Sequence, residues 1–366
     1  MAEESRRTTD QGGRCEDESL PPGERPAAGA SEGLAQSERC LRLSSGKLFR
    51  YDRSRSYTSD DGGKTWSDGG PLISYHGLGP ASCQTLDYTA VQIQNGEHVG
   101  RIVIPYYLEM DGQHPDYTRQ QRGGYAVWKG EKIPLETHTH VPELAGGFMN
   151  LSDDEGATWG HSDGFLMGYL DDGHLGHWSC EEPVVAELKD GRLLCFIRST
   201  CGRILKSTSG DGGQSWSKVE ATELAMSNSP CRLNRIPGTG DLVLLWNQMS
   251  ADEIQRGYRR GRLSIAISKD DGKTWEGFRT VVQSPGVDDV TRVEPPPLTP
   301  MVRGGSGPDE ILGEIPDGFV HYHYPEIHFS RDGETIHLYV RVSTPGGGLD
   351  PIWRSFPIRW LYEGTD

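Results

Sequence analysis

The feature that most constrains the fold of this chain is an eight-residue pattern that occurs four times. The pattern reads Ser-x-Asp-x-Gly-x-Thr-Trp, and its copies begin at Ser59, Ser152, Ser209 and Ser268. The third copy has Ser215 in the Thr position and keeps the other fixed residues. Copies spaced at intervals of tens of residues indicate an architecture built from repeated units.

The residues of each copy favour a tight turn between two β-strands. Ser and Asp side chains accept hydrogen bonds from nearby backbone N–H groups. The Gly permits a positive φ at the bend, and we expect the Trp ring to bury its area against its own sheet. The Asp-x-Asp-x-Gly order is also found in calcium loops, but no bidentate Glu follows Asp61 at the required distance. We therefore interpret the copies as structural turns and predict no metal site.

The four turns resemble the Asp-box, or bacterial neuraminidase repeat (BNR), of the sialidase-like β-propellers. The resemblance extends over residues 38–362, and it implies an all-β, six-bladed propeller. Five blades are explicit in the sequence, and we expect the sixth within 67–150 or 281–320. The predicted domain organisation is a disordered tail over 1–36 and one propeller over 37–366.

Composition and charge narrow the class of protein. The tail carries eight acidic and four basic residues and too few aliphatic residues to form a core. It lacks the apolar core of a secretion signal, and no apolar run is long enough to cross a membrane, so we expect a cytoplasmic protein. A net charge of −16 argues against a nucleic-acid partner. The seven cysteines form no metal-binding spacing and indicate no disulfide framework.

Three polar residues occupy the same register position in different blades. The first hairpin of each of these blades turns at a glycine, namely Gly96, Gly191 and Gly333. Nine residues before these glycines lie Asp87, Glu182 and Tyr324. Because the first strands of blades line the axis of a propeller, we expect these side chains to meet at one end of the central channel. The alternative is that they are ordinary strand ends facing water.

A Tyr beside a Glu has a clear chemical use. A phenol is a poor nucleophile at neutral pH, but a neighbouring carboxylate can accept its proton as it attacks. Sialidases use such a Tyr in place of a carboxylate nucleophile. Their substrate carries a carboxylate of its own, which a guanidinium group binds through two hydrogen bonds.

The resemblance to sialidases extends to individual residues. The segment from Glu182 to Arg198 is similar to the one that supplies the sialidase Glu and one member of its arginine triad. Tyr324, in Tyr-Pro-Glu-Ile, resembles the nucleophile segment. Arg260 matches the position of another triad arginine, and Arg259 and Arg262 are close enough to compete for that assignment.

The N-terminal part departs from the family pattern. The Arg-Ile-Pro segment that supplies the first triad arginine is missing, which leaves Arg39 as the only candidate. For the acid that protonates the leaving oxygen, the candidates are Asp52 and Asp87. His177, shortly before Glu182, is expected near the same channel mouth, where it could contact substrate hydroxyls.

These observations lead to one principal hypothesis and two alternatives. The principal one is an exo-acting, retaining glycoside hydrolase that releases a terminal sialic acid or a related keto-sugar acid, without cofactor. The first alternative is a carbohydrate-binding propeller without turnover. The second is a hydrolase or lyase for a different acidic sugar. In each case the expected partner is an acidic carbohydrate, and neither nucleic acid nor a membrane is expected.

Overall fold

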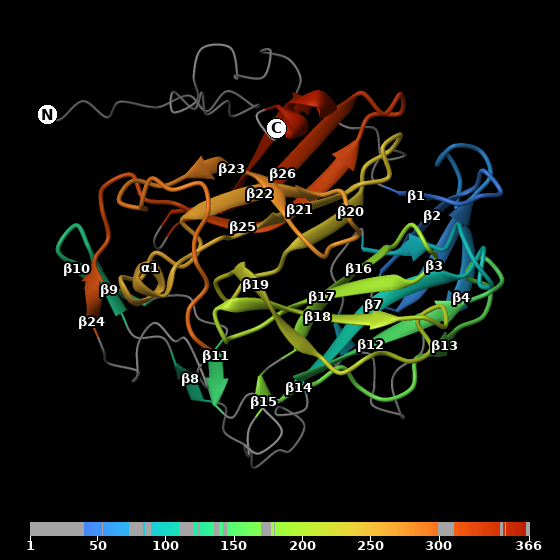
Figure 1. The fold of residues 1–366 in the computed structure, drawn as a ribbon, viewed down its shortest axis with the longest axis horizontal. Helices are drawn as coiled ribbons and strands as arrows, with labels where there is room; N and C mark the ends of the chain where they lie inside the picture. The colour runs from blue at the N-terminus through green and yellow to red at the C-terminus, as the bar shows by residue number, and fades with distance from the viewer. Residues whose placement is uncertain are drawn as a thin grey trace, which may run out of the picture.

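Five antiparallel sheets follow one another along the chain and form the blades of a β-propeller. Figure 1 shows them in chain order, from blue through green and yellow to red. The computed structural model describes residues 40–52, 54–72, 83–84, 89–109, 120–122, 125–134, 139–141, 145–169, 177–178, 180–298, 311–344, 347 and 349–363. The all-β prediction is confirmed for this part of the chain.

Blades 1 and 2 each end with a copy of the repeated turn between their last two strands. Blade 1 consists of β1 (Leu41–Arg42), β2 (Leu48–Tyr51), β3 (Arg55–Ser59) and β4 (Ser67–Pro71). Blade 2 consists of β5 (Cys83–Gln84), β6 (Val91–Gln92), β7 (Ile102–Glu109), β12 (Ala145–Ser152) and β13 (Gly160–His161). Both β5 and β6 pair with β7, so the inner strand of blade 2 is interrupted.

Blades 3 and 4 are regular four-stranded sheets, and blade 5 has three strands. Blade 3 consists of β16 (Glu181–Glu187), β17 (Leu193–Arg198), β18 (Arg203–Ser209) and β19 (Glu220–Ala225). Blade 4 consists of β20 (Arg232–Arg235), β21 (Leu242–Trp246), β22 (Arg262–Ser268) and β23 (Glu276–Gln283). Blade 5 consists of β25 (His321–Phe329), β26 (Thr335–Ser343) and β27 (Leu349–Pro357), followed by a short 3-10 helix over Ile358–Tyr362.

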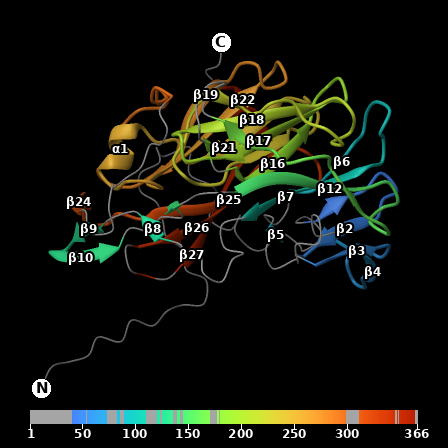
Figure 2. The same ribbon diagram turned by 90° about the horizontal axis from the view of Figure 1, so that it is seen from below.

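The remaining strands form small sheets outside the blades. They are β8 (Gln120–Arg122) with β11 (Thr139–Val141), β14 (Gly168–Tyr169) with β15 (His177–Trp178), and β9 (Tyr125–Trp128) between β10 (Glu131–Pro134) and β24 (Ile311–Glu314). Figure 2 shows β9, β10 and β24 at the edge of the molecule, on the same side as the helix α1 (Ala251–Gln255).

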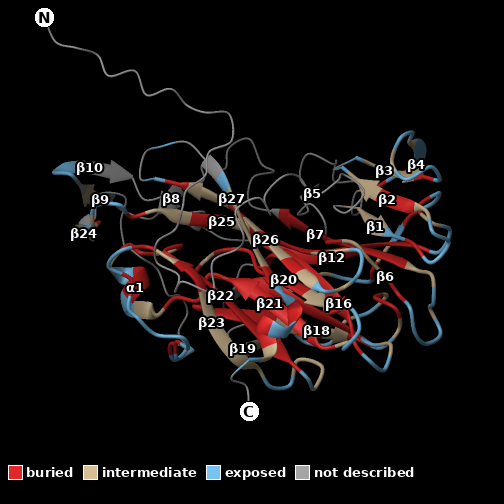
Figure 3. Cartoon of the chain, turned by 90° about the horizontal axis from the view of Figure 1, so that it is seen from above, coloured by how far each residue is buried: buried red, intermediate tan, exposed pale blue. Residues whose placement is uncertain are grey.

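Four of the five apolar clusters among the described residues form layers, each shared by two successive blades. Phe49 of blade 1 packs with Ile102 of blade 2, and Val103 of blade 2 packs with Val185 of blade 3. Similar clusters join blades 3 and 4 and blades 4 and 5. Inner and second strands such as β16, β17 and β21 are therefore buried on both faces, and Figure 3 shows β21 in red. This explains why they read as continuous apolar runs in the sequence.

The prediction of six blades is not confirmed. The described residues form five blades, and no apolar cluster among them joins blade 5 to blade 1. The described parts of 67–150 and 281–320, where the sixth blade was expected, contribute strands of blades 1, 2 and 4 and short strands of the small sheets. The predicted disordered tail over 1–36 lies outside the described residues.

The hydrogen bonds of the repeated turns confirm their structural role. In the first copy, Asp61 Oδ1 accepts the backbone N–H of Thr65 at 2.9 Å, and Asp61 Oδ2 accepts the Thr65 hydroxyl at 2.6 Å. Ser59 Oγ accepts the N–H of Gly63 at 2.8 Å, and Trp66 Nε1 donates to the Gly63 carbonyl. The equivalent Ser, Asp and Gly residues make the same contacts in the other three copies.

The Trp rings do not all pack as the sequence suggested. Trp159, in the turn of blade 2, lies 6.1 Å from the Phe49 ring of blade 1 and donates to Ser56 Oγ there. Trp275 of blade 4 meets Phe196 of blade 3 in the same way. The box tryptophans of blades 2 and 4 therefore bind the preceding blade, not only their own sheet.

Gly156, in the second copy of the repeated turn, also lets this turn pack closely against blade 1. A Cβ atom at Gly156 would lie 2.9 Å from the Phe49 ring, and Gly156 has a φ of +88°. Only glycine meets both conditions without strain. The glycine of the repeat thus serves the contact between blades as well as the bend.

Among the described residues, no helix is long and apolar enough to cross a membrane.

We predict that the box tryptophans differ in their effect on stability. Trp159 is 8% exposed and joins two blades, so Trp159→Ala should lower the free energy of unfolding by about 3–5 kcal/mol in urea titrations. Trp66→Ala should cost less than half as much, because the partly exposed Trp66 ring is covered by Arg50 of its own sheet. Equal losses would contradict the role of these rings in joining blades.

A second prediction concerns pH. Hydrogen bonds from Thr65 and Ser59 lower the pKa of Asp61, so its stabilising effect is complete above the unfolded pKa of about 4 and is lost as the pH falls below it. Asp61→Ala should lower the melting temperature at pH 7, and the difference from wild type should shrink below pH 4. Asp60→Ala, in the exposed neighbouring position, is the matched control and should show neither effect.

Candidate active site

Glu182 and Tyr324 occupy equivalent, irregular positions near the start of the inner strands β16 and β25. Their φ angles are +45° and +49°, and each is followed by a proline. The strand pairing shifts register at both places, between Glu181 and Val184 and between His323 and Glu326. Bulges of this kind re-aim a side chain, and a positive φ in a non-glycine residue is a strained conformation often found at functional sites.

Arg198, on β17, forms a buried ion pair with Glu182. Arg198 Nη1 lies 2.6 Å from Glu182 Oε2, and the side chains are 2% and 4% exposed. Glu181 adds a second carboxylate at 3.6 Å. Burial alone would lower the pKa of Arg198, but the charges of Glu182 and Glu181 outweigh it and raise the pKa. Arg198 Nη2 is buried and has no hydrogen-bond partner in the described part of the chain.

Two further arginines contact the Tyr324 ring. The guanidinium carbons of Arg260 and Arg341 are 5.7 and 5.6 Å from the centre of the ring. Burial raises the pKa of the Tyr324 hydroxyl, and so does the charge of Glu182, whereas Arg260 and Arg198 lower it. The hydroxyl makes no hydrogen bond to Glu182 among the described residues.

A chain of polar contacts holds Arg260 in place. Arg260 Nη1 lies 2.7 Å from His323 Nδ1, and His323 Nε2 lies 2.8 Å from Ser343 Oγ. Because a guanidinium only donates, Nδ1 must accept and Nε2 must carry the proton. Asn228 joins the two sides of the site, since its backbone carbonyl accepts from Arg260 and its side-chain oxygen accepts from Arg198 at 2.7 Å.

The charge of Arg260 lowers the pKa of two neighbouring groups, Arg259 and His321. Burial and the charge of Arg260 lower the pKa of Arg259 to about 10. Burial and the charges of both arginines lower the pKa of His321 to about 4, so this imidazole is neutral at physiological pH. Arg259 and Arg260 therefore lie close together in a protein that carries a net charge of −16.

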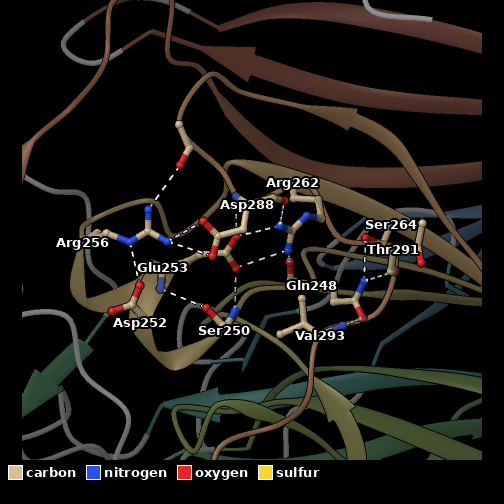
Figure 4. A network of polar contacts seen from close by, with 11 residues as sticks. Gln248, Ser250, Asp252, Glu253, Arg256, Arg262, Ser264, Asp288, Thr291 and Val293 are labelled. Carbon is tan, nitrogen blue, oxygen red and sulfur yellow. Dashed lines mark hydrogen bonds and ion pairs between the residues drawn. The ribbon is translucent and has the colours of Figure 1, made fainter. Parts of the chain in front are cut away.

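Arg262, unlike Arg259 and Arg260, is paired with a residue of the helix α1. It forms a fully buried pair with Glu253 of α1, with Arg262 Nη2 2.6 Å from Glu253 Oε1 (Figure 4). Glu253 also accepts the backbone N–H of Ser250 and completes a capping box at the start of the helix. The pair thus fixes the connection between β21 and β22, from which Arg259 and Arg260 project.

The same network fixes the chain that follows β23. Arg262 donates to the Asp288 carbonyl, and Asp288 N–H donates to Glu253. Gln248 accepts from the backbone N–H of Val293 and donates to the Thr291 carbonyl (Figure 4). Two segments far apart in sequence are therefore held together behind the candidate site.

Inner strands of three blades meet around a small cavity. This cavity of about 20 Å³ is lined by residues of β6, β16 and β20 and by Thr89 and Ala90. Arg232, at the start of β20, lines this cavity and donates from Nε to the Pro325 carbonyl at 2.6 Å. Arg232 therefore holds the backbone directly after Tyr324.

The other predicted site residues are Asp52, Arg39, Asp87 and His177, and the structure describes the side chain of Asp52 alone. Asp52 closes a turn, accepting the backbone N–H groups of Ser54 and Arg55 and the Tyr57 hydroxyl. Desolvation raises the pKa of Asp52, but these hydrogen bonds outweigh it and the net pKa is lowered. Arg39 and Asp87 lie outside the described residues. For His177 only the backbone, in β15, is described.

The sequence analysis missed Arg341, Asn228, His323 and Arg232. Arg341 lies on the second strand of blade 5, opposite His323, and the register argument had compared first strands only. Extending it to the second strands would have found Arg341. Asn228 lies in a connection between blades and gives no comparable signal in the sequence.

The repeated turns and the blades match a known family. A profile described as "BNR repeat-like domain" matches residues 44–338. The chain belongs to this family. The anhydrosialidase of the leech Macrobdella decora is 24% identical to this BNR propeller over 221 residues, which are 59% of the chain and 23% of the leech protein. The chain thus spans less than a quarter of that relative's length.

Several solved structures are similar to this BNR propeller. A leech intramolecular trans-sialidase has a TM-score of 0.48 at 17% identity, over 86% of this chain and 37% of its own. The intramolecular trans-sialidase of Ruminococcus gnavus has a TM-score of 0.46 at 19% identity, over 86% and 51%. A Dyadobacter fermentans protein of unknown function has a TM-score of 0.49 at 16% identity, over 87% and 75%.

The buried pair of this BNR propeller provides a stability prediction. Arg262→Met or Glu253→Leu alone should lower the free energy of unfolding by about 3–5 kcal/mol, because each leaves an unpaired buried charge. The double variant should lose no more than either single variant. Arg256→Met is the matched control: Arg256 pairs with Asp252 and Asp288 at the surface, and its loss should cost less than about 1 kcal/mol. Additive losses in urea titrations would contradict the coupling.

Proposed function

We propose that this BNR propeller is an exo-acting glycoside hydrolase of the sialidase type. It releases a terminal sialic acid or a related keto-sugar acid with retention of configuration. The observation that carries the proposal is the arrangement around Tyr324, where one phenol is within electrostatic reach of the Glu182–Arg198 pair and of Arg260. The proposed fold is the six-bladed sialidase propeller.

Tyr324 would attack the anomeric carbon. A neutral phenol suits this substrate, because the substrate carboxylate would repel an anionic nucleophile. Burial and Glu182 raise the pKa of Tyr324, so the hydroxyl reaches the reaction protonated and needs a base. Glu182, paired with Arg198, would accept that proton as the covalent glycosyl–tyrosine intermediate forms.

Two arginines would bind the substrate carboxylate. Arg198 offers its Nη2, which is buried and has no partner among the described residues. Arg260 is fixed over the Tyr324 ring by His323. Donors held in place before the substrate arrives need not reorganise during the reaction. The positive charges of these two arginines also favour the approach of an acidic sugar to a protein that is acidic overall.

The acid that protonates the leaving oxygen would be Asp87 or Asp52. The lowered pKa of Asp52 and its hydrogen bonds to the turn make it a poor proton donor near neutral pH. Asp87 precedes by two residues Thr89, which lines the axial cavity, and we favour it for this role. Arg39 and His177 remain proposed substrate contacts.

The relative named anhydrosialidase, at 24% identity, is consistent with an enzyme that acts on sialosides. The second candidate function is a carbohydrate-binding propeller without turnover. It is favoured by one observation: Glu182 is hydrogen-bonded to Arg198 and not to the Tyr324 hydroxyl. Catalytic hydrogen bonds often form only when the substrate is bound, so turnover has to be measured.

We predict that the protein hydrolyses a fluorogenic α-sialoside and that Tyr324→Phe lowers kcat/KM by at least about 1,000-fold, since the nucleophile is lost. Glu182→Gln should lower kcat by about 100-fold or more, because the base is lost. Both rates are measured by fluorophore release, with folding checked by thermal unfolding.

Tyr339→Phe, on the neighbouring strand of the same blade, is the matched control and should retain activity. Wild-type turnover that survives Tyr324→Phe would overturn the assignment of the nucleophile. Binding of sialic acid without turnover would favour the second candidate function. An inactive wild type that binds no acidic sugar would overturn both.

A further inference from the structure

A buried guanidinium group lines the small cavity between the inner strands of blades 2, 3 and 4. Arg232, on β20, is 5% exposed and contributes to the wall of this cavity. Its Nε donates to the Pro325 carbonyl, but its Nη1 is buried and has no hydrogen-bond partner in the described part of the chain. Because a buried donor without a partner costs free energy, Arg232 favours a hydrogen-bond acceptor in the cavity.

The charge of Arg232 is only partly compensated by the protein. The ion pairs of the described residues include the buried arginines Arg198 and Arg262 but not Arg232. Glu326, which acts on Arg232 electrostatically, is itself bound by His328, whose Nε2 lies 2.8 Å from Glu326 Oε2. Burial lowers the pKa of Arg232, and the charge of Glu326 does not offset this effect. Since a guanidinium group stays protonated in proteins, a counterion at this position would be stabilising.

The other residues around the cavity also suit an anion better than a cation. Asn234 lies two residues after Arg232 in β20, on the same face of the strand, and its amide group can donate hydrogen bonds. Thr89 adds a hydroxyl group, which lies 2.9 Å from the Tyr51 hydroxyl. The remaining lining residues are alanine, valine and leucine, and no acidic residue lines the cavity in the part of the chain that the structure describes.

The size of the cavity restricts the anion to a single atom. Its volume of about 20 Å³ exceeds the about 10–15 Å³ that one water molecule needs, but it is too small for a sugar, a sulfate or the carboxylate of an organic acid. Among single-atom anions, the free-energy cost of leaving water falls as the ionic radius increases. Chloride therefore enters an interior with mostly apolar walls more readily than fluoride does.

We propose that Arg232 binds a chloride ion in this cavity, with Asn234 as a second donor. The ion neutralises the buried guanidinium and connects the inner strands of three blades. Because Arg232 also binds the Pro325 carbonyl, the ion restrains the backbone that directly follows Tyr324. The chloride site is too small for the proposed sugar substrate, so it does not depend on the proposed function.

Thermal unfolding of the full chain tests the proposal in about 150 mM sodium chloride and in the same concentration of sodium gluconate, whose anion is too large for the cavity. For a dissociation constant of about 10 mM, the Tm of the wild type should be about 2–4 °C higher in chloride. Arg232→Met should remove this difference. The matched control is Arg235→Met, on the opposite face of the same strand, where Arg235 binds the Glu187 and Gly240 carbonyls. This control should be less stable in both salts but keep the difference between them.

Bromide locates the ion directly, because it replaces chloride and scatters X-rays anomalously. Wild-type crystals soaked in sodium bromide should show an anomalous peak in the cavity, in contact with Arg232 Nη1. If Arg232→Met does not fold, the position of the bromide decides the question alone. A cavity without bromide, which a water molecule then fills, overturns the inference, as does a chloride effect that a folded Arg232→Met retains in full. A protein inactive on sialosides overturns the proposed function and leaves the chloride site standing.

Discussion

The apolar packing between successive blades is the interaction on which the rest of this structure depends. Each of the four core layers draws residues from two neighbouring sheets, so no blade buries its faces alone. The repeated turn contributes to this packing directly, since Trp159 and Trp275 reach the blade before their own. Because the inner strands are held from both sides, their starts can adopt conformations that an isolated hairpin would not sustain.

The candidate site depends on this rigid support at two equivalent residues, Glu182 and Tyr324. Glu182 and Tyr324 both have positive φ angles, both precede a proline, and both lie where the pairing of an inner strand shifts register. Strain of this kind persists only where the surrounding structure determines the backbone. At Tyr324 part of that support comes from Arg232, which binds the Pro325 carbonyl from the neighbouring blade.

The interior around α1 differs from the apolar layers because it contains a buried ion pair. The Arg262–Glu253 pair is completely buried and connects α1, β22 and the chain around Asp288. Such a pair contributes little net stability compared with apolar residues of similar size, but it fixes where the segment carrying Arg259 and Arg260 emerges. Of the three neighbouring arginines, Arg260 contacts the Tyr324 ring, and His323 and Asn228, which lie elsewhere in the sequence, hold it in place.

The sequence by itself determined the repeated unit and the all-β propeller. It also showed that Glu182 and Tyr324 occupy equivalent positions in their blades. These follow from local rules: the hydrogen-bonding pattern of the turn, and the counting of residues along a strand from its hairpin. Tertiary structure alone decided that Trp159 packs on blade 1, that Arg262 is structural, and that Arg341 approaches Tyr324. Contacts between blades depend on how separate sheets are placed in space, and residue spacing along the chain identified equivalent positions in the blades but not which of their side chains pack against a neighbouring blade.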